Sequence, residues 1–110
     1  MFVEAKDLVD LDYFSVSDPI CKLSKRDVIS DGGNFEDVGE TEVIDNNLNP
    51  KWIKHFTVMF SFLKDLELKF EVENYNGPDD RDPIGMCTIL LSELMMTVGM
   101  QKTIILTLPT

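Results

Sequence analysis

A regular alternation of apolar and charged residues over positions 65–72 constrains the fold of this chain more than any other pattern. From Leu66 to Val72 every second residue is apolar, and the residues between them are Glu, Lys and Glu. Because successive side chains of a strand point to opposite faces, this period of two predicts a strand with one buried and one solvated face.

The same period recurs elsewhere and predicts an all-β fold. Further strands are expected at 2–5, 20–24, 40–44, 54–60, 84–90 and 104–108, where β-branched and aromatic residues are frequent. Clusters of Gly, Asn and Pro at 31–34, 46–50 and 74–78 are typical of turns. Ser92 can cap one short helical turn at 92–96. Seven or eight short strands without a long helical period predict a single antiparallel β-sandwich domain over residues 1–110.

The acidity of the chain excludes one class of partner. Its 110 residues contain 20 Asp and Glu and 10 Lys and Arg, so the formal net charge is −10. Proteins bind nucleic acids by neutralising phosphates with Lys and Arg, so no nucleic-acid partner is expected. The hydrophobic content of 44% is typical of a folded domain and not of a disordered chain.

Other functional classes lack their motifs. Apolar runs such as Ile104-Ile105-Leu106 are far shorter than the about 20 residues of a membrane-spanning helix, and the first residues do not follow the pattern of a signal peptide. Cys21 and Cys87 are too few for a disulfide framework, and two free thiols are the favoured alternative to one disulfide. The single histidine, His55, has no Cys or Ser placed to form a nucleophile–base pair, so no enzyme is expected.

Acidic residues gather in two segments between predicted strands. The first segment contains Asp7, Asp10, Asp12 and Asp18, and the second contains Asp79, Asp80 and Asp82. One interpretation is that Asp forms turns in polar loops. A sandwich, however, collects its loops at two ends, and carboxylates that converge at one end repel one another unless a cation lies among them. Six to eight hard oxygen ligands of this kind suit Ca²⁺.

Three segments together resemble a known family. Asp-Tyr-Phe-Ser-Val-Ser-Asp-Pro at 12–19 is followed by Gly-Glu-Thr-Glu-Val-Ile at 39–44 and by Asn-Asn-Leu-Asn-Pro-Lys-Trp at 46–52. This combination resembles a C2 domain, and the stretch 39–58 is most similar to the first C2 domain of copines. The resemblance covers nearly the whole chain.

The resemblance implies an eight-stranded antiparallel sandwich of the C2 Greek-key type, with at most one short helix and with calcium-binding loops at one end. It also implies a non-enzymatic module, cytoplasmic and peripheral to the plasma membrane or other membranes, that docks onto acidic phospholipids with calcium as its cofactor. Copines carry a second C2 domain and a von Willebrand A-type domain, and these 110 residues match neither.

The calcium positions of the family fall on single residues of this chain. The first loop of the family supplies two acids six residues apart, which Asp12 and Asp18 match. In the third loop Asp82 matches the last acid, whereas the first two positions fall on Asn74 and Asn76. An Asn side chain offers one neutral oxygen and cannot bind a cation with two oxygens as a carboxylate does.

The loss of two charges leaves two interpretations of the site open. Asp79 and Asp80 lie in the same loop and compensate in part if they face the cation. Because calcium affinity follows the charge and rigidity of the ligands, the chain either binds calcium with reduced affinity or does not bind it.

Two further sets of residues are candidates for contact with lipid. Tyr13 and Phe14 stand beside Asp12 at the tip of the first loop, where they either enter the headgroup region or fold back onto the sandwich. Lys22, Lys51 and Lys54 either form a basic lipid patch on one sheet face or are scattered lysines that keep the domain soluble.

Two functions of different classes follow from the sequence. The first is a copine-like, calcium-dependent phospholipid-binding module with a weakened calcium site. The alternative is a calcium-independent module that binds a protein partner, and the two Asn residues in the third loop favour it.

Overall fold

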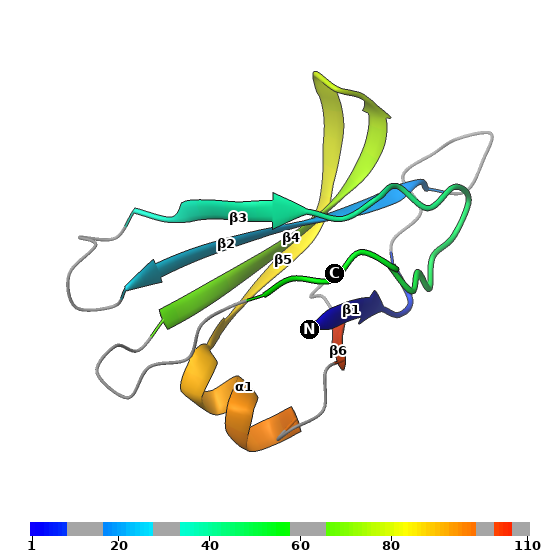
Figure 1. Cartoon of the computed structure of the whole chain (residues 1–110). Coiled ribbons are helices and arrows are strands. Elements are labelled where there is room, and N and C mark those ends of the chain that lie inside the picture. The colour runs from blue at the N-terminus through cyan, green and yellow to red at the C-terminus, as the bar shows by residue number, and fades with distance from the viewer. Residues whose placement is uncertain (9–16, 28–33, 58–65, 99–102, 107–110) are drawn as a thin grey trace.

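A computed structural model describes residues 1–8, 17–27, 34–57, 66–98 and 103–106 (Figure 1). These residues form six strands and one helix: β1 (Phe2–Ala5), β2 (Pro19–Asp27), β3 (Glu36–Glu40), β4 (Leu66–Gly77), β5 (Asp80–Leu90), α1 (Leu91–Val98) and β6 (Thr103–Leu106). Strands β3-β2-β4-β5, in that order, form an antiparallel sheet, and β1 and β6 form a second sheet. The predicted all-β fold with one short helix is therefore confirmed.

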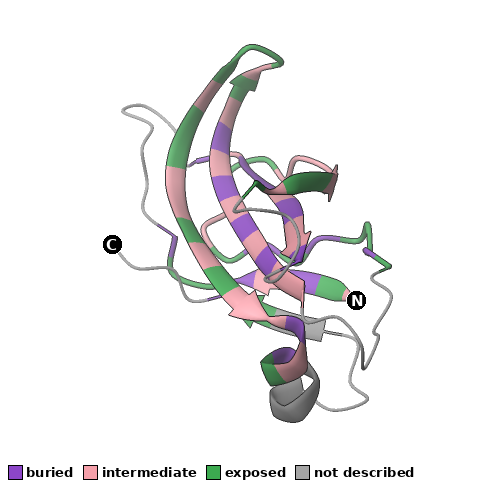
Figure 2. Cartoon of the chain, turned by 90° about the vertical axis from the view of Figure 1, so that its left-hand side faces the viewer, coloured by how far each residue is buried: buried purple, intermediate pink, exposed green. Residues whose placement is uncertain are grey.

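Strand β4 organises the larger sheet. It pairs with β2 from Pro19 opposite Asn74 to Asp27 opposite Leu66, and on its other side it pairs with β5 as a hairpin. Of the alternation predicted at 65–72, the part from Glu67 to Val72 is confirmed, since buried and partly exposed residues alternate there along β4 (Figure 2), whereas Asp65 lies outside the described residues. Gly77 ends the strand, and only the next two residues form the turn. The turn expected at 74–78 is therefore mostly strand.

The buried face of β4 builds the core. Leu68, Phe70 and Val72 are fully buried and pack with Leu23 of β2 and with Trp52. Burial of a large apolar side chain contributes about 1.5–3 kcal/mol relative to leaving it exposed. These residues therefore fix which face of β4 points inward, because a slip of one residue in the register would move all of them to the solvent.

The second sheet differs from the expected antiparallel arrangement. Strands β1 and β6 pair in parallel, from Phe2 opposite Thr103 to Ala5 opposite Leu106. Parallel neighbours cannot be joined by a tight turn, and these two strands lie at opposite ends of the chain. On the other side of β1, the N–H of Trp52 donates to the carbonyl of Val3 at 3.2 Å.

Some predicted strands differ from the observed elements. The structure describes six strands, so the expected number of eight is not confirmed within the described residues. The strand expected at 40–44 lies earlier, at Glu36–Glu40. The residues after it form no strand but keep hydrogen bonds to β2, such as that from the Thr41 N–H to the carbonyl of Cys21 at 2.8 Å. Of the strand expected at 54–60, positions 54–57 form no strand, although Phe56 is buried, and 58–60 lie outside the described residues.

We expect Phe70→Ala to lower the free energy of unfolding by about 3–5 kcal/mol, because it removes a fully buried ring from the core. Urea denaturation followed by far-UV circular dichroism measures this loss. Phe2→Ala is the matched control, because Phe2 is 38% exposed. This variant should lower the free energy of unfolding by less than half as much as Phe70→Ala. Equal losses in the two variants would contradict the assignment of the core.

Candidate functional site

Residues of the two predicted acidic loops lie together at one end of the larger sheet. The backbone N–H of Asp18 donates to Oδ1 of Asn74 at 2.9 Å, and the N–H of Tyr75 donates to the carbonyl of Asp18 at 3.0 Å. Asn74 in turn lies opposite Asp82 in the register of β4 and β5. With Asn76, which contacts Asp82, the structure thus brings together four of the residues that the sequence assigned to a calcium site, whereas Asp12 lies outside the described residues.

The Asn74 side chain has a structural task at this point. It is fully buried, and its carbonyl oxygen binds the first loop to β4. A carboxylate at the same position would lose its hydration and would lie close to the negative charges of Asp18 and Asp82. Burial of an unpaired charge is energetically costly. A neutral amide therefore stabilises this end of the domain in the absence of a cation.

A third segment reaches the same end. The backbone N–H of Asn46 donates to Oδ1 of Asp18 at 2.7 Å. Asn46 has a positive φ of 52°, a conformation that Asn tolerates better than most residues. The Asn-rich turn is apparent in the sequence, but its contact with Asp18 is not. A residue suited to positive φ close to the predicted site was the available signal.

The tip of the β4–β5 hairpin carries the remaining acids. Nδ2 of Asn76 donates to Oδ2 of Asp82 at 3.0 Å, and both residues are exposed. Asp79 lies in the turn, Asp80 begins β5, and both are exposed. The amide of Asn76 therefore offsets part of the negative charge of Asp82.

The described residues fit a calcium ion only in part. Within the described part of the chain, no three His, Cys, Asp or Glu side chains converge as a metal-binding group. Asp18 and Asp82 are hard oxygen donors, but each already accepts a hydrogen bond from an amide. Such a donor set suits a cation held weakly, with fewer protein ligands than the six to eight that Ca²⁺ takes.

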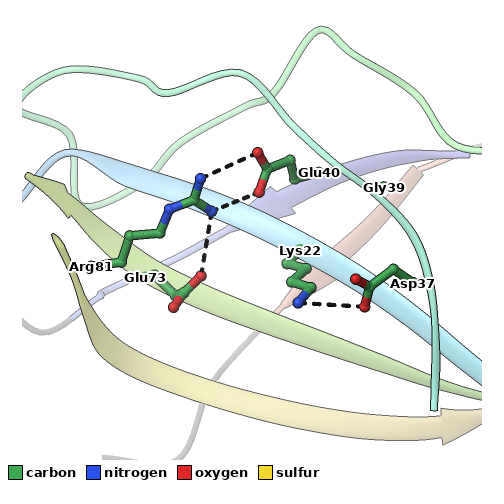
Figure 3. A pocket seen from close by; sticks show the side chains of 6 residues that line it. All are labelled: Lys22, Asp37, Gly39, Glu40, Glu73 and Arg81. Atoms are coloured by element: carbon green, nitrogen blue, oxygen red, sulfur yellow. Dashed lines mark hydrogen bonds and ion pairs between the residues drawn. The ribbon is translucent and has the colours of Figure 1, made fainter. Parts of the chain in front are cut away.

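The outer face of the larger sheet carries a chain of alternating charges that no sequence pattern predicted. Arg81 donates from Nη1 to Oε2 of Glu40 at 2.6 Å and from Nη2 to Oε1 at 3.3 Å, and its Nη1 lies 3.8 Å from Oε1 of Glu73. Between β2 and β3, Nζ of Lys22 lies 3.4 Å from Oδ1 of Asp37. Together with Gly39 these residues line an open depression of about 460 Å³ (Figure 3).

The ion pair between Arg81 and Glu40 changes the acidity of both groups. The hydrogen bond from Arg81 is the main reason why the pKa of Glu40 lies below its ordinary value of 4.5, and the nearby charges of Lys22 and Lys54 act in the same direction. Conversely, the hydrogen bond to Glu40 raises the pKa of Arg81. Both groups are therefore charged at neutral pH.

Of the three lysines predicted as a lipid patch, only Lys22 lies in one of the named strands. Lys22 is in β2 and faces Asp37. Lys51 lies opposite Glu4 of β1. The backbone N–H of Lys54 donates to Glu42 at 3.1 Å. Of these three contacts, only that of Lys22 pairs the ammonium group with a carboxylate, which reduces its local positive charge.

Cys21 and Cys87 are free, as predicted. Burial is the main cause that raises the pKa of the Cys21 thiol to about 12, so this sulfur stays protonated and is a poor nucleophile.

None of the helices in the described residues is long and apolar enough to cross a bilayer.

Comparison with known proteins identifies related sequences. A family model described as C2 domain matches residues 1–106. The chain is 36% identical over 96 residues to Copine-E of Dictyostelium discoideum, an alignment that covers 84% of this chain and 17% of that protein. It is 33% identical over 89 residues to Nicotinic receptor-associated protein 1 of Caenorhabditis elegans, covering 69% of this chain and 14% of that protein. The chain thus spans less than a fifth of these relatives.

Solved structures show the same fold. A C2 domain of plant Extended Synaptotagmin 1 superposes with a TM-score of 0.64 at 25% identity, covering 84% of this chain and 66% of that chain. BON1-C2B superposes with a TM-score of 0.60 at 32% identity, covering 83% of this chain and 62% of that chain.

We expect Glu40→Gln to reduce stability at neutral pH but not in acid. A carboxyl whose pKa is lowered by folding stabilises the native state above its ordinary pKa of 4.5, and this contribution is lost as the pH falls through the lower pKa of the folded state. Because the Glu40 side chain is 43% exposed, solvent screening limits the difference to within about 1 kcal/mol. Urea unfolding of both proteins between neutral and acidic pH measures it.

The control for this experiment is Glu36→Gln, which neutralises an exposed carboxylate of the same strand. The difference in free energy of unfolding between Glu36→Gln and the unchanged protein should vary less with pH than the corresponding difference for Glu40→Gln. A Glu40→Gln difference that stays constant from neutral pH to below 4.5 would contradict the stabilising role of the ion pair.

Proposed function

Because this chain belongs to the C2 domain family, a family of non-catalytic binding modules, we propose that it docks onto acidic phospholipid surfaces and that calcium strengthens this docking weakly. The observation that supports the proposal is that Asp18, Asn74 and Asp82 lie together at one end of the sheet. Docking of this kind is peripheral to a membrane, and we propose a cytoplasmic location for it.

The electrostatics support a role for a cation. A domain with a net charge of −10 is repelled by acidic lipid, and at physiological salt this repulsion extends over roughly 8–10 Å. Asp18 and Asp82 would hold the ion, together with Asp12 and the side-chain oxygen of Asn76, and Asp79 lies in the adjoining turn. Bound calcium would supply the positive charge that attracts lipid phosphates.

The contacts of the two Asn residues support weak affinity. The Asn74 oxygen accepts the N–H of Asp18 and is therefore engaged within the protein. The Asn76 amide group donates to Asp82, one of the proposed ligands. A cation would have to compete with this bond, and it would gain less from neutral oxygens than from carboxylates.

Two predictions about lipid contact remain part of the proposal. Tyr13 and Phe14 would insert into the headgroup region next to the cation, and both lie outside the described residues. Lys22, Lys51 and Lys54 would contribute to lipid contact, and Lys22 would contribute less because Asp37 offsets its positive charge.

A protein-interaction module that works without calcium is the second candidate. The internal bonds of Asn74 and Asn76 favour it, because they hold this end together without an ion. One relative is named for association with a nicotinic receptor, which makes binding of a protein by this chain a reasonable alternative.

Co-sedimentation with vesicles of phosphatidylserine and phosphatidylcholine, with millimolar calcium or with chelator, tests the proposal. We expect more protein in the pellet with calcium than with chelator, and only with the acidic lipid. Asp82→Asn should reduce the calcium-dependent part, since it removes a proposed ligand charge while keeping an acceptor for Asn76. Glu36→Gln, at the opposite end of the sheet, should not.

Each outcome of this experiment decides one part of the proposal. Equal binding with calcium and with chelator would exclude the role of calcium. Absence of binding to acidic vesicles in both conditions would exclude membrane docking and favour the protein-interaction module.

We expect the double variant Asn74→Asp, Asn76→Asp to bind calcium at least about ten-fold more tightly than the unchanged protein, because two carboxylates join the ligand set. In chelator the variant should be the less stable protein, since the carboxylate introduced at position 74 would bury a charge where a neutral amide now lies. Calorimetric titration and thermal unfolding with and without calcium measure both effects.

Asn34→Asp serves as the control for this gain of charge, because Asn34 is exposed and lies outside the loop end. It adds a carboxylate to the chain without adding one to the proposed site. If it raised calcium affinity as much as the double variant does, the gain would come from general charge and not from the site.

A further inference from the structure

The open depression on the outer face of the larger sheet is lined almost entirely by charged groups from all four strands. Asp37 and Glu40 belong to β3, Lys22 to β2, Glu73 to β4 and Arg81 to β5. Figure 3 shows these side chains turned toward one another above the sheet. With a volume of about 460 Å³ the depression is large enough to receive a side chain of another molecule.

The charges in this depression alternate along a line. Asp37 pairs with Lys22 at 3.4 Å, Lys22 lies opposite Glu40 in the register of β2 and β3, and Glu40 holds Arg81 through two hydrogen bonds. Glu73 is the fifth group, at 3.8 Å from Arg81. Three carboxylates and two cations leave one negative charge in excess.

This arrangement selects the sign of a ligand. Both cations already have a carboxylate neighbour, so an anionic ligand would have to break an existing pair and would meet the excess negative charge. A cationic group breaks no pair. It continues the alternation beside Glu73, whose contact with Arg81 is the longest in the chain of charges, or beside Asp37, whose side chain is 71% exposed.

From this geometry we infer that the depression binds a Lys or Arg side chain of a partner protein. The ammonium or guanidinium group lies beside Glu73, and the partly enclosed position, in which the Glu73 side chain is 23% exposed, strengthens the attraction relative to a fully solvated pair. The inference does not depend on membrane docking, because it concerns a different surface from the loop end.

Titration of the whole chain with a short capped peptide of Lys, Arg and Gly at low salt tests this inference. Chemical-shift changes in two-dimensional ¹H–¹⁵N NMR spectra should concentrate on the strands around Lys22, Glu40, Glu73 and Arg81. Glu73→Gln removes the excess charge and should weaken binding about five-fold. Lys22→Gln leaves Asp37 without its cation and should strengthen binding by a similar factor, a result that a merely damaged surface would not give.

Glu67→Gln is the matched control, since it removes one carboxylate from the same face of the same strand but outside the depression, where Glu67 pairs with Arg26 at 3.0 Å. Its effect on affinity should be less than about two-fold. Equal weakening by Glu67→Gln and Glu73→Gln would show that the peptide follows only the net charge of the domain, and it would overturn the inference.

Inositol trisphosphate provides the anionic comparison in the same titration. We expect it to cause smaller shifts in the depression than the basic peptide. Stronger binding of the phosphate, with weakening by Lys22→Gln, would overturn the inference by showing that the depression is an anion site.

Discussion

The pairing of β4 with a strand on each side determines the rest of this structure. One face of β4 carries Leu68, Phe70 and Val72 into the core, and the other carries charged residues. Because β2 and β5 lock β4 on both edges, the two faces cannot exchange without loss of the core. The same register places Asn74 beside the first loop and Glu73 beside Arg81. The loop end and the charged depression are thus consequences of one strand alignment.

The sequence predicted which residues of β4 face inward, but only up to Val72, and it did not predict the strands that pair with them. Apolar periodicity identified the inward residues, but the next inward residue is Asn74, a polar side chain that is typical of turns. Its burial depends on a hydrogen bond to Asp18, which lies 56 residues away and is invisible to any local pattern. The strand expected at 40–44 was displaced for a similar reason, because the partner strand decides which residues pair and β-branched composition does not.

The candidate site was predictable to the same extent. Resemblance to the family identified Asp18, Asn74 and Asp82, which the structure brings together at the loop end. The chain of charges on the sheet was not predictable, because Lys22, Glu40 and Arg81 are far apart in sequence and meet only through the strand order. Ion-pair partners across strands require the register, and no spacing along the chain supplies it.

The net charge of −10 is distributed unevenly for reasons that these contacts explain. On the outer face of the larger sheet, five carboxylates lie within 4 Å of four basic residues, so this face retains only about one negative charge. Most of the surplus therefore belongs to other parts of the chain, among them the exposed acids of the hairpin tip. There, the neutral side chains of Asn74 and Asn76 avoid the repulsion that carboxylates would exert on Asp18 and Asp82, which favours stability of this end without a cation. In the proposed calcium site, the same neutral side chains would lower the affinity for the ion. The two residues would therefore have opposite effects on stability without calcium and on affinity for calcium.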